Sequence, residues 1–371
     1  MAMSSGHLKS LLVAVFSGCI IFFSNETFAQ SHEKETHEKE EHVKSEKKEG
    51  FDASEVIFSH ILDAHQFHFL SYTGSDGHEH HVSIPLPVIV YSDKRGFSMF
   101  SSSKFHHGEH AHDGYRLEKN KIVPVDASEK VYDLSLTRNV VQMIIALILL
   151  VWILVGMANK YKKNGAKKAP SGLQNAVEPV ITFVRDEVAI PNLGHKYQKY
   201  LPYLLTVFFF ILINNIFGLI PGSANVTGNI AFTFVLAVIS FIVILASTNS
   251  HFWAHIFWFP GVPVPVKILM LIVELLGVIT KPFALMVRLF ANMMAGHIII
   301  ICLVSLIFIF GGLSKAIGWG FSPVSIGFAV FIYLIEVMVA FIQAFIFTNL
   351  TAVFIGQAFE GEHEHGEEAH H

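Results

Sequence analysis

The stretch ITKPFALMVRLFANMMAGHIII, residues 279–300, decides how this chain folds, because it sets Arg288 inside a largely apolar run from Val266 to Phe310. A guanidinium in the hydrocarbon core of a bilayer costs at least ~2.5 to 3.5 kcal/mol on insertion scales, and it cannot lose its proton to escape that cost. Only water or carboxylates compensate a cation that stays ionised. Arg288 therefore predicts a polar path at membrane depth and is a candidate functional residue.

The composition around this stretch is that of a polytopic membrane protein. The chain has 371 residues, of which 52% are hydrophobic and only 15% charged. It holds several apolar runs of ~20 residues, each long enough to cross a bilayer. These values exclude an ordinary soluble enzyme domain. The formal net charge of -4 says little about partners, because most charged residues lie in the tails and connecting segments.

The N-terminus has the layout of a secretory signal peptide. Lys9 precedes an apolar core at 11–23, and the small residues around Ala29 suit a cleavage site, so residues 1–29 are predicted to be removed. Residues 30–50 form a charged, His-rich tether that is too polar to build a core. Removal of the signal leaves Cys302 as the one cysteine, so no intramolecular disulfide is expected.

Residues 51–135 are predicted to form a small α+β extracytoplasmic domain. Asp52 and Glu55 resemble a capping box that begins an amphipathic helix reaching about Phe69. A hairpin is expected from strands at 81–91 and 97–100, with a turn at 93–96. Pro85 and Pro87 are expected to confine the first of these strands to an edge of its sheet.

Residues 136–359 are predicted to form an all-α membrane domain with about five crossings. The first helix, about 140–158, ends in a lysine cluster around Lys160 that places this end in the cytoplasm. Residues 171–190 are only partly apolar and are expected to lie along the inner surface; their charged side chains are Glu178, Arg185, Asp186 and Glu187. Segments 201–220 and 230–246 form a predicted helical hairpin with an uncharged outer connection.

Two long C-terminal stretches complete the membrane domain. Residues 266–310 and 321–359 are each far longer than the ~20 residues of a perpendicular span, so both are expected to be tilted or kinked helices. Five crossings return the C-terminus to the cytoplasm, where residues 360–371 form a His- and Glu-rich tail. The expected location is the bacterial inner membrane, with a periplasmic N-terminal domain.

Within the stretch 266–310, three ionisable residues are spaced so that they share one side of a helix. At ~100° per residue, Glu274, Lys281 and Arg288 lie within ~40° of one another, and Asn292 follows one turn later on the same side. His297 points to the opposite side of a straight helix, which suggests that it serves a different compartment.

Two polar residues of the last helix, Glu336 and Gln343, share one face and lie ~10 Å apart along the axis. Structural roles are also open for several of these side chains. Lys267 is expected to snorkel to the membrane surface as an anchor. Lys281 could be such an anchor or could belong to the polar path. His297 and Glu336 could form a structural pair, and two asparagines, Asn214 and Asn215, are expected to bond helix to helix rather than carry ions.

Three separated blocks resemble the signature of subunit a of rotary F-type ATP synthases. They are MVRLFANMMAGH at 286–297, INNIFGLIP at 213–221 and QAFIF at 343–347, and they occur in family order within residues 140–360. By this resemblance, Arg288 is the essential stator arginine and Gln343 is its neighbour on the last helix. The resemblance likewise assigns the cytoplasmic-side path to Glu274 and Asn292, and the outer-side path to His297 and Glu336.

The resemblance implies a stator subunit with two proton half-channels and an arginine that faces a rotor ring of small hairpin subunits. A peripheral stalk subunit and membrane lipid are the other partners it implies, with no nucleic acid, cofactor or metal. The chain lacks a GxxxxGK[ST] loop, so nucleotide binding by that route is not expected, and catalysis of ATP formation must belong to another subunit.

Two other functions compete with this one. A secondary ion transporter or channel also places charged groups at the membrane midplane, and it predicts transport by this chain alone. A metal-handling membrane protein is suggested by the 22 histidines, among them His106, His107, His110 and His112, although such tracts are more commonly solvated tails. The choice between protons and sodium ions depends largely on the ring carboxylate, which this chain does not contain.

Overall fold

The computed structural model describes residues 63–73, 79–108, 110–118, 120–126, 129–164, 172–220, 222–248 and 264–358. The predicted signal peptide, the predicted tether, residues 51–62 of the predicted extracytoplasmic domain and the C-terminal tail lie outside these ranges. The chain divides into two compact units. The first unit holds residues 1–143, 217–226 and 295–334, and the second holds 144–216, 227–294 and 335–371.

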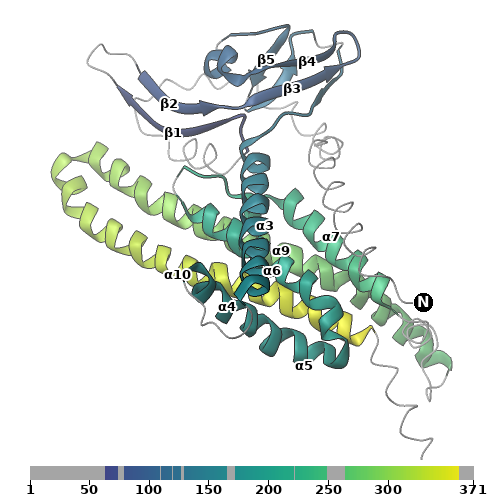
Figure 1. Cartoon of the computed structure of the whole chain (residues 1–371). Coiled ribbons are helices and arrows are strands. Elements are labelled where there is room, and N and C mark those ends of the chain that lie inside the picture. The colour runs from purple at the N-terminus through teal and green to yellow at the C-terminus, as the bar shows by residue number, and fades with distance from the viewer. Residues whose placement is uncertain are drawn as a thin grey trace, which may run out of the picture. The chain divides into compact units, whose positions relative to one another are not determined.

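Within the described residues, seven short strands build the domain that precedes the membrane helices (Figure 1). Strands β1 (Gln66–Thr73) and β2 (Glu79–Pro85) pair antiparallel. Strands β3 (Pro87–Ser92), β4 (Gly96–Ser101) and β7 (Val131–Asp133) form a sheet in the order β4-β3-β7. Strands β5 (Tyr115–Glu118) and β6 (Lys121–Pro124) form a third, two-stranded sheet.

Two expectations for this domain were wrong. The helix expected to reach Phe69 is replaced, from residue 66 onward, by strand β1. The hairpin with its turn at 93–95 is confirmed, but the strand expected at 81–91 is divided between β2 and β3, and β3 is the central strand of its sheet and not an edge. Pro87 is tolerated there because it is the first residue of the strand, a position that sheets allow to proline.

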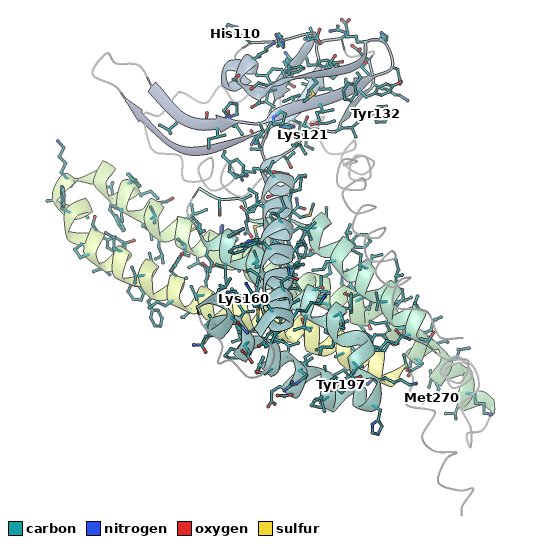
Figure 2. The ribbon with its side chains drawn as sticks, viewed as in Figure 1. His110, Lys121, Tyr132, Lys160, Tyr197 and Met270 are labelled. Carbon is teal, nitrogen blue, oxygen red and sulfur yellow. The ribbon has the colours of Figure 1, made fainter. Side chains whose placement is uncertain are left out.

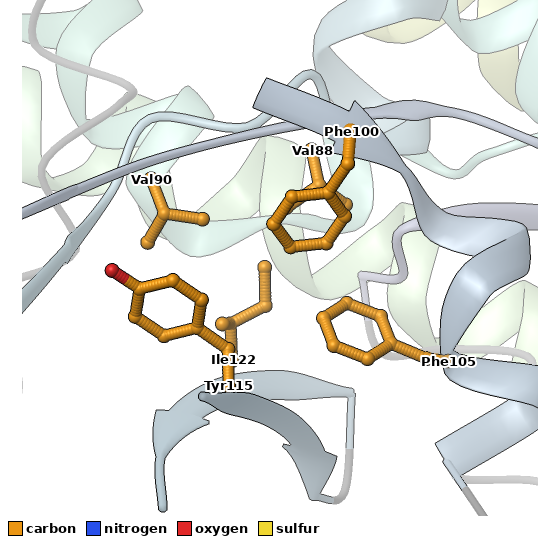
Figure 3. Close-up of a cluster of buried hydrophobic side chains, with 6 residues drawn as sticks. All are labelled: Val88, Val90, Phe100, Phe105, Tyr115 and Ile122. Atoms are coloured by element: carbon orange, nitrogen blue, oxygen red, sulfur yellow. The ribbon is translucent and has the colours of Figure 1, made fainter. Parts of the chain in front are cut away.

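The core of the domain lies on one face of the β4-β3-β7 sheet. Side chains from β3 and β4 point toward those of the β5/β6 sheet and of helix η2 (Ser102–Gly108), as Figure 3 shows. The cluster consists of Val88, Val90, Phe100, Phe105, Tyr115 and Ile122. The rings of Phe100 and Phe105 meet edge to face with centroids 5.3 Å apart, a favoured aromatic geometry. This packing fixes which face of the sheet turns inward.

The segment before β1 ties the sheet to the first membrane helix. His65 Nε2 lies 2.8 Å from Asp133 Oδ2 at the end of β7. The Ala64 carbonyl accepts from the backbone N–H of Arg138, and the carboxylate of Asp63 accepts from that of Asn139. Both donors stand in the first turn of the helix, where N–H groups lack intrahelical partners. Three adjacent residues therefore hold both sides of the junction.

The His65 and Asp133 side chains perturb each other's pKa. Burial alone would lower the pKa of His65, but the hydrogen bond to Asp133 and its negative charge outweigh burial, so the pKa of His65 is raised. Burial alone would raise the pKa of Asp133, but the hydrogen bond from His65 outweighs it, so the pKa of Asp133 is lowered. The pair is thus stabilised in its ionised form.

Five helices within the described ranges are long and apolar enough to cross a membrane. Helix α3 (Arg138–Asn164) contains the predicted first span and ends in the expected lysines, of which Lys160 is labelled in Figure 2. Helices α6 (Tyr197–Leu219) and α7 (Ile230–Ser247) match the predicted hairpin. Helix α7 begins with Asn229, whose side chain accepts from the N–H of Ala231 as an N-cap.

Residues 172–196 form a series of shorter helices. Helix α4 (Leu173–Phe183) continues through the π-helix η4 (Val184–Ala189) into α5 (Ile190–Leu193) and η5 (Gly194–Lys196). Helical geometry runs on into α6 with little interruption. The expectation that this segment lies along the inner surface stays a prediction.

The last two helices are α9 (Val264–Leu313) and α10 (Lys315–Gln357), and only Ser314 separates them. The helix expected to begin at residue 321 therefore begins at Lys315. Such a short connection requires close backbones, and a Cβ added to Gly318 would lie 2.7 Å from the Cα of Gly311. The rings of Phe310 and Phe321 then meet beyond the turn, with centroids 4.7 Å apart. The glycine pair permits the tight antiparallel hairpin.

Candidate functional site

Arg288 lies on the exposed side of α9. The buried side of the same helical region is formed by a stripe of large apolar residues, namely Leu285, Met286, Leu289 and Met293. Among the described residues Arg288 has no ion pair, since the recorded ion pairs all involve other side chains. Within the part of the chain that the structure describes, this cation is therefore presented outward and is not neutralised by an acid.

The residues flanking Arg288 on this exposed side are small. Ala284 precedes it by one helical turn and Ala291 follows by one turn, and both are exposed, as is Asn292. Small residues let the backbone of a neighbouring helix approach closely within a membrane. The surface around the guanidinium is consequently flat enough to admit another helix.

The predicted polar stripe toward the start of α9 is only partly open. Glu274 and Lys281 are half-buried. Lys281 Nζ donates to Gln357 Oε1 of α10 at 3.2 Å and lies 4.9 Å from the centroid of the Phe354 ring. Lys281 thus contacts the end of α10, which explains its polarity without a role in ion transfer.

Glu336 and Gln343 lie on one buried stripe of α10, together with Ala340, Ala344 and Phe347. Their shared face agrees with the helical spacing, and seven residues correspond to ~10 Å along the axis. Both polar side chains are 7% exposed or less. The sequence therefore predicted correctly that they face the same side of the helix.

Several buried acceptor atoms of α6 and α10 lack a donor among the described residues. Asn215 Nδ2 of α6 donates to the carbonyl of Ala340, one turn from Glu336, at 3.1 Å. Asn214 Nδ2 donates to the Phe210 carbonyl of its own helix at 2.8 Å. Both Glu336 carboxyl oxygens and both asparagine Oδ1 atoms are buried and lack a hydrogen-bond partner among the described residues. Such acceptors require a proton or water to be satisfied.

The expectation that Asn214 and Asn215 bond between helices is confirmed for Asn215, which links α6 to α10. Asn214 bonds within α6 instead. His297 is half-buried and belongs to the first unit, whereas Glu336 belongs to the second. The pairing of these two residues in one path stays a prediction.

Arg288 and Gln343 lie within ~10 Å of each other along the axes of the α9–α10 helix pair. The helices run antiparallel, and Lys281 is level with residues 354–357 of α10. Two turns further along α9, Arg288 is therefore level with residues ~347–350, and Gln343 lies ~6–10 Å beyond along the axis. The exposed cation and the buried amide thus belong to the same stretch of the helix pair.

A contact that the sequence did not predict holds α5 against α10. Asn192 Nδ2 donates to Asn349 Oδ1 at 2.9 Å, and a Cβ on Gly356 would lie 2.2 Å from the Asn192 carbonyl oxygen. The only signal in the sequence is an asparagine and a glycine within an apolar helix, a pattern common where membrane helices approach closely.

No group of three or more potential metal ligands occurs among the described residues. His110 is exposed, and His112 is bonded through its backbone to Tyr115. All the histidines of the C-terminal tail lie outside the described residues, and the metal-handling hypothesis gains no support from the domain that the structure describes.

Comparison with known proteins adds independent information. Residues 140–356 match the family model described as ATP synthase A chain, and residues 56–142 match a domain of unknown function. Chloroherpeton thalassium has an ATP synthase subunit a that is 50% identical over 245 residues, covering 64% of this chain and 71% of that protein. ATP synthase subunit a 2 of Prosthecochloris aestuarii is 47% identical over 246 residues, covering 64% of this chain and 73% of that protein.

Proposed function

Because this chain belongs to the ATP synthase A chain family, we propose that it is the proton-translocating stator subunit of a rotary ATP synthase in the bacterial inner membrane. It would provide two proton half-channels and an essential arginine, Arg288, facing a rotor ring of small hairpin subunits. A peripheral stalk subunit would hold it against rotation. The predicted periplasmic N-terminal domain and cytoplasmic C-terminus belong to the same proposal.

The observation that carries this proposal is the environment of Arg288. The guanidinium is exposed on a largely apolar helix, is flanked by alanines, and has no ion pair among the described residues. A permanent cation with an open, low-relief surface suits a partner that brings carboxylates close to it and then removes them.

The proposed chemistry at Arg288 is electrostatic. A ring carboxylate that reaches the guanidinium loses its proton, since a nearby opposite charge favours the ionised form. The same positive charge repels a free proton, so Arg288 blocks direct leakage between the two half-channels. A lysine would be a poorer substitute because it can lose its proton when buried.

The two half-channels are assigned to different residues. Glu274 and Asn292 are proposed to line the path from the cytoplasm, and His297 and Glu336 the path from outside. The unpartnered oxygens of Glu336 support its assignment, because a buried carboxyl group without fixed donors can accept and release a proton through water. A membrane potential of about 100 mV would supply ~2.3 kcal/mol for each proton moved.

Replacement of Arg288 tests this function. In membrane vesicles that hold the assembled complex, we expect Arg288→Ala to abolish ATP-driven acidification, measured with a pH-sensitive dye. Arg185→Ala is the matched control, because Arg185 is an exposed arginine that pairs with the neighbouring Asp186. Acidification at the normal rate by Arg288→Ala would refute the assignment.

A further inference from the structure

The β4-β3-β7 sheet has a second face that the core does not cover. Because side chains alternate along a strand, the residues between the buried positions of β3 and β4 point away from the cluster of Figure 3. We define this outer face by Ile89, Tyr91, Phe97, Met99 and Tyr132. An antiparallel sheet with one solvated face normally carries polar residues there. Here it carries aromatic and aliphatic ones.

These side chains form one continuous apolar surface. The strand register places Phe97 opposite Tyr91 and Tyr91 opposite Tyr132, with Met99 opposite Ile89 in the next row. The Tyr91 and Tyr132 rings lie with centroids 6.3 Å apart. Phe97 and Met99 are 64% and 66% exposed. A contiguous apolar patch of this kind marks an interaction surface rather than scattered surface residues.

The position of the sheet in the chain indicates what this surface meets. The backbone N–H groups of Leu134 and Leu136 continue the pairing with β3, and helix α3 begins at Arg138. Tyr132, which is labelled in Figure 2, precedes that helix by six residues, a reach of at most ~20 Å at ~3.3 Å per residue. Ile89 is opposite Leu134, two residues nearer the helix, and Met99 lies in the same row beyond Ile89. The outer face is therefore continuous with a segment that enters the membrane.

The chemistry of the outer face suits a lipid surface. Tyrosine rings with a polar hydroxyl are enriched where a membrane meets water. Lys94 and Lys130 are exposed beside the apolar rows. The nearby acid Glu129 is buried and bonded to Ser92 and Arg95, which leaves Asp93 as the exposed acid of this turn. The patch is thus apolar with a basic border, as expected for contact with anionic headgroups.

We propose that the outer face of the β4-β3-β7 sheet lies against the periplasmic surface of the membrane, with Phe97 and Met99 at the boundary between headgroups and acyl chains. The sheet then serves as a second, interfacial anchor beside helix α3. This proposal does not depend on the function of Arg288, since it concerns only the domain before the membrane helices.

Spin labels on the full complex test this contact. Both native cysteines, Cys19 and Cys302, are replaced by alanine, and a nitroxide is attached at Phe97→Cys or, as the matched control, at Val125→Cys. Val125 is 55% exposed but lies outside the outer face, after β6. The complex is reconstituted in vesicles of phosphatidylethanolamine and phosphatidylglycerol. Collision of each label with oxygen and with a water-soluble nickel chelate is then compared.

We expect the ratio of oxygen to nickel collisions to be several-fold higher at residue 97 than at residue 125, because oxygen concentrates in lipid and the chelate does not enter it. Equal, chelate-dominated ratios would show that the outer face is in water, which overturns the proposal. Low access to both reagents at residue 97 would show that protein covers the face, and would equally overturn it. Since Phe97 is exposed, neither substitution disturbs the core.

Discussion

At the scale of single residues, the site is defined by groups that their own chain leaves without partners. Arg288 has no counter-charge and Glu336 has no donor among the described residues. A cation and a carboxyl group this close to lipid are costly unless something compensates them. For Arg288 the natural compensation is a carboxylate on another protein, and for Glu336 it is water or a proton.

The carboxyl group of Glu336 offers a direct prediction. Glu336→Gln keeps the size of the side chain and removes its ability to exchange a proton, so ATP-driven acidification of vesicles should slow by at least ~100-fold, the lower end expected for lost acid–base function. The matched control is Met338→Gln, which introduces the same side chain at an exposed position of the same helix. A pumping rate that is unchanged from pH 6 to 8 would count against the role of Glu336.

At the scale of helices and strands, close backbone contacts decide how the elements fit. Gly318 beside Gly311 permits the turn between α9 and α10, and Gly356 permits α5 to approach α10. In each case a Cβ would enter space that backbone atoms occupy. Backbone atoms cannot rotate away as a flexible side chain can, so substitutions at these glycines must shift whole helices.

Gly356→Ala should therefore destabilise the protein by ~1–3 kcal/mol, the usual range for overpacking. Its matched control is Gly327→Ala on the same helix, where an added Cβ meets nothing within 4 Å. That change should be neutral or stabilise by up to ~1 kcal/mol, because alanine is the better helix former. Thermal unfolding of the purified complex compares the two variants. Equal midpoints would show that the α5–α10 contact does not require glycine.

Hydropathy was sufficient to locate the membrane helices, because each is a long run with few charged residues. It placed the start of the last helix at residue 321, whereas the structure begins α10 at Lys315 and includes Gly318 in it. The sheet was harder to predict. The centre of the β4-β3-β7 sheet depends on β7, a strand of 3 residues that no local pattern could reveal. The outer face was likewise hidden until pairing fixed the register.

At the scale of the whole molecule, one junction connects the β-strand domain to a membrane helix. Asp63, Ala64 and His65 bond to both the end of β7 and the first turn of α3. Orientation of the domain thus depends on a few contacts that include one titratable pair. A change in the charge of that pair would therefore weaken the contacts that join β7 to the first turn of α3.

The junction should accordingly depend on pH. His65 has a raised pKa, so its contribution is present below its ordinary pKa of 6.5 and is lost as pH rises through the folded value. Asp133 has a lowered pKa, so its contribution is present above 3.8 and is lost as pH falls through the folded value. Stabilisation is therefore greatest between about pH 4 and pH 6.5.

Amide hydrogen exchange of residues 131–139 in the intact complex measures this effect. After correction for intrinsic exchange rates, protection should be higher at pH 5.5 than at pH 8. Asp133→Asn should flatten the profile, while Asp126→Asn, at an exposed acid elsewhere in the domain, should leave it unchanged. Protection that is the same at both pH values in the unmodified protein would contradict the prediction.

The one-residue link at Ser314 has a consequence for how the protein is made. Helix α9, with its unpaired arginine, leaves the ribosome before the 43 residues of α10 that pack beside it. At ~5–20 residues per second this interval lasts ~2–9 s. Because the connection is a single residue, the second helix can fold back only along the first. The two helices therefore enter the bilayer as one hairpin. The insertion machinery must therefore hold α9 until α10 has been synthesised.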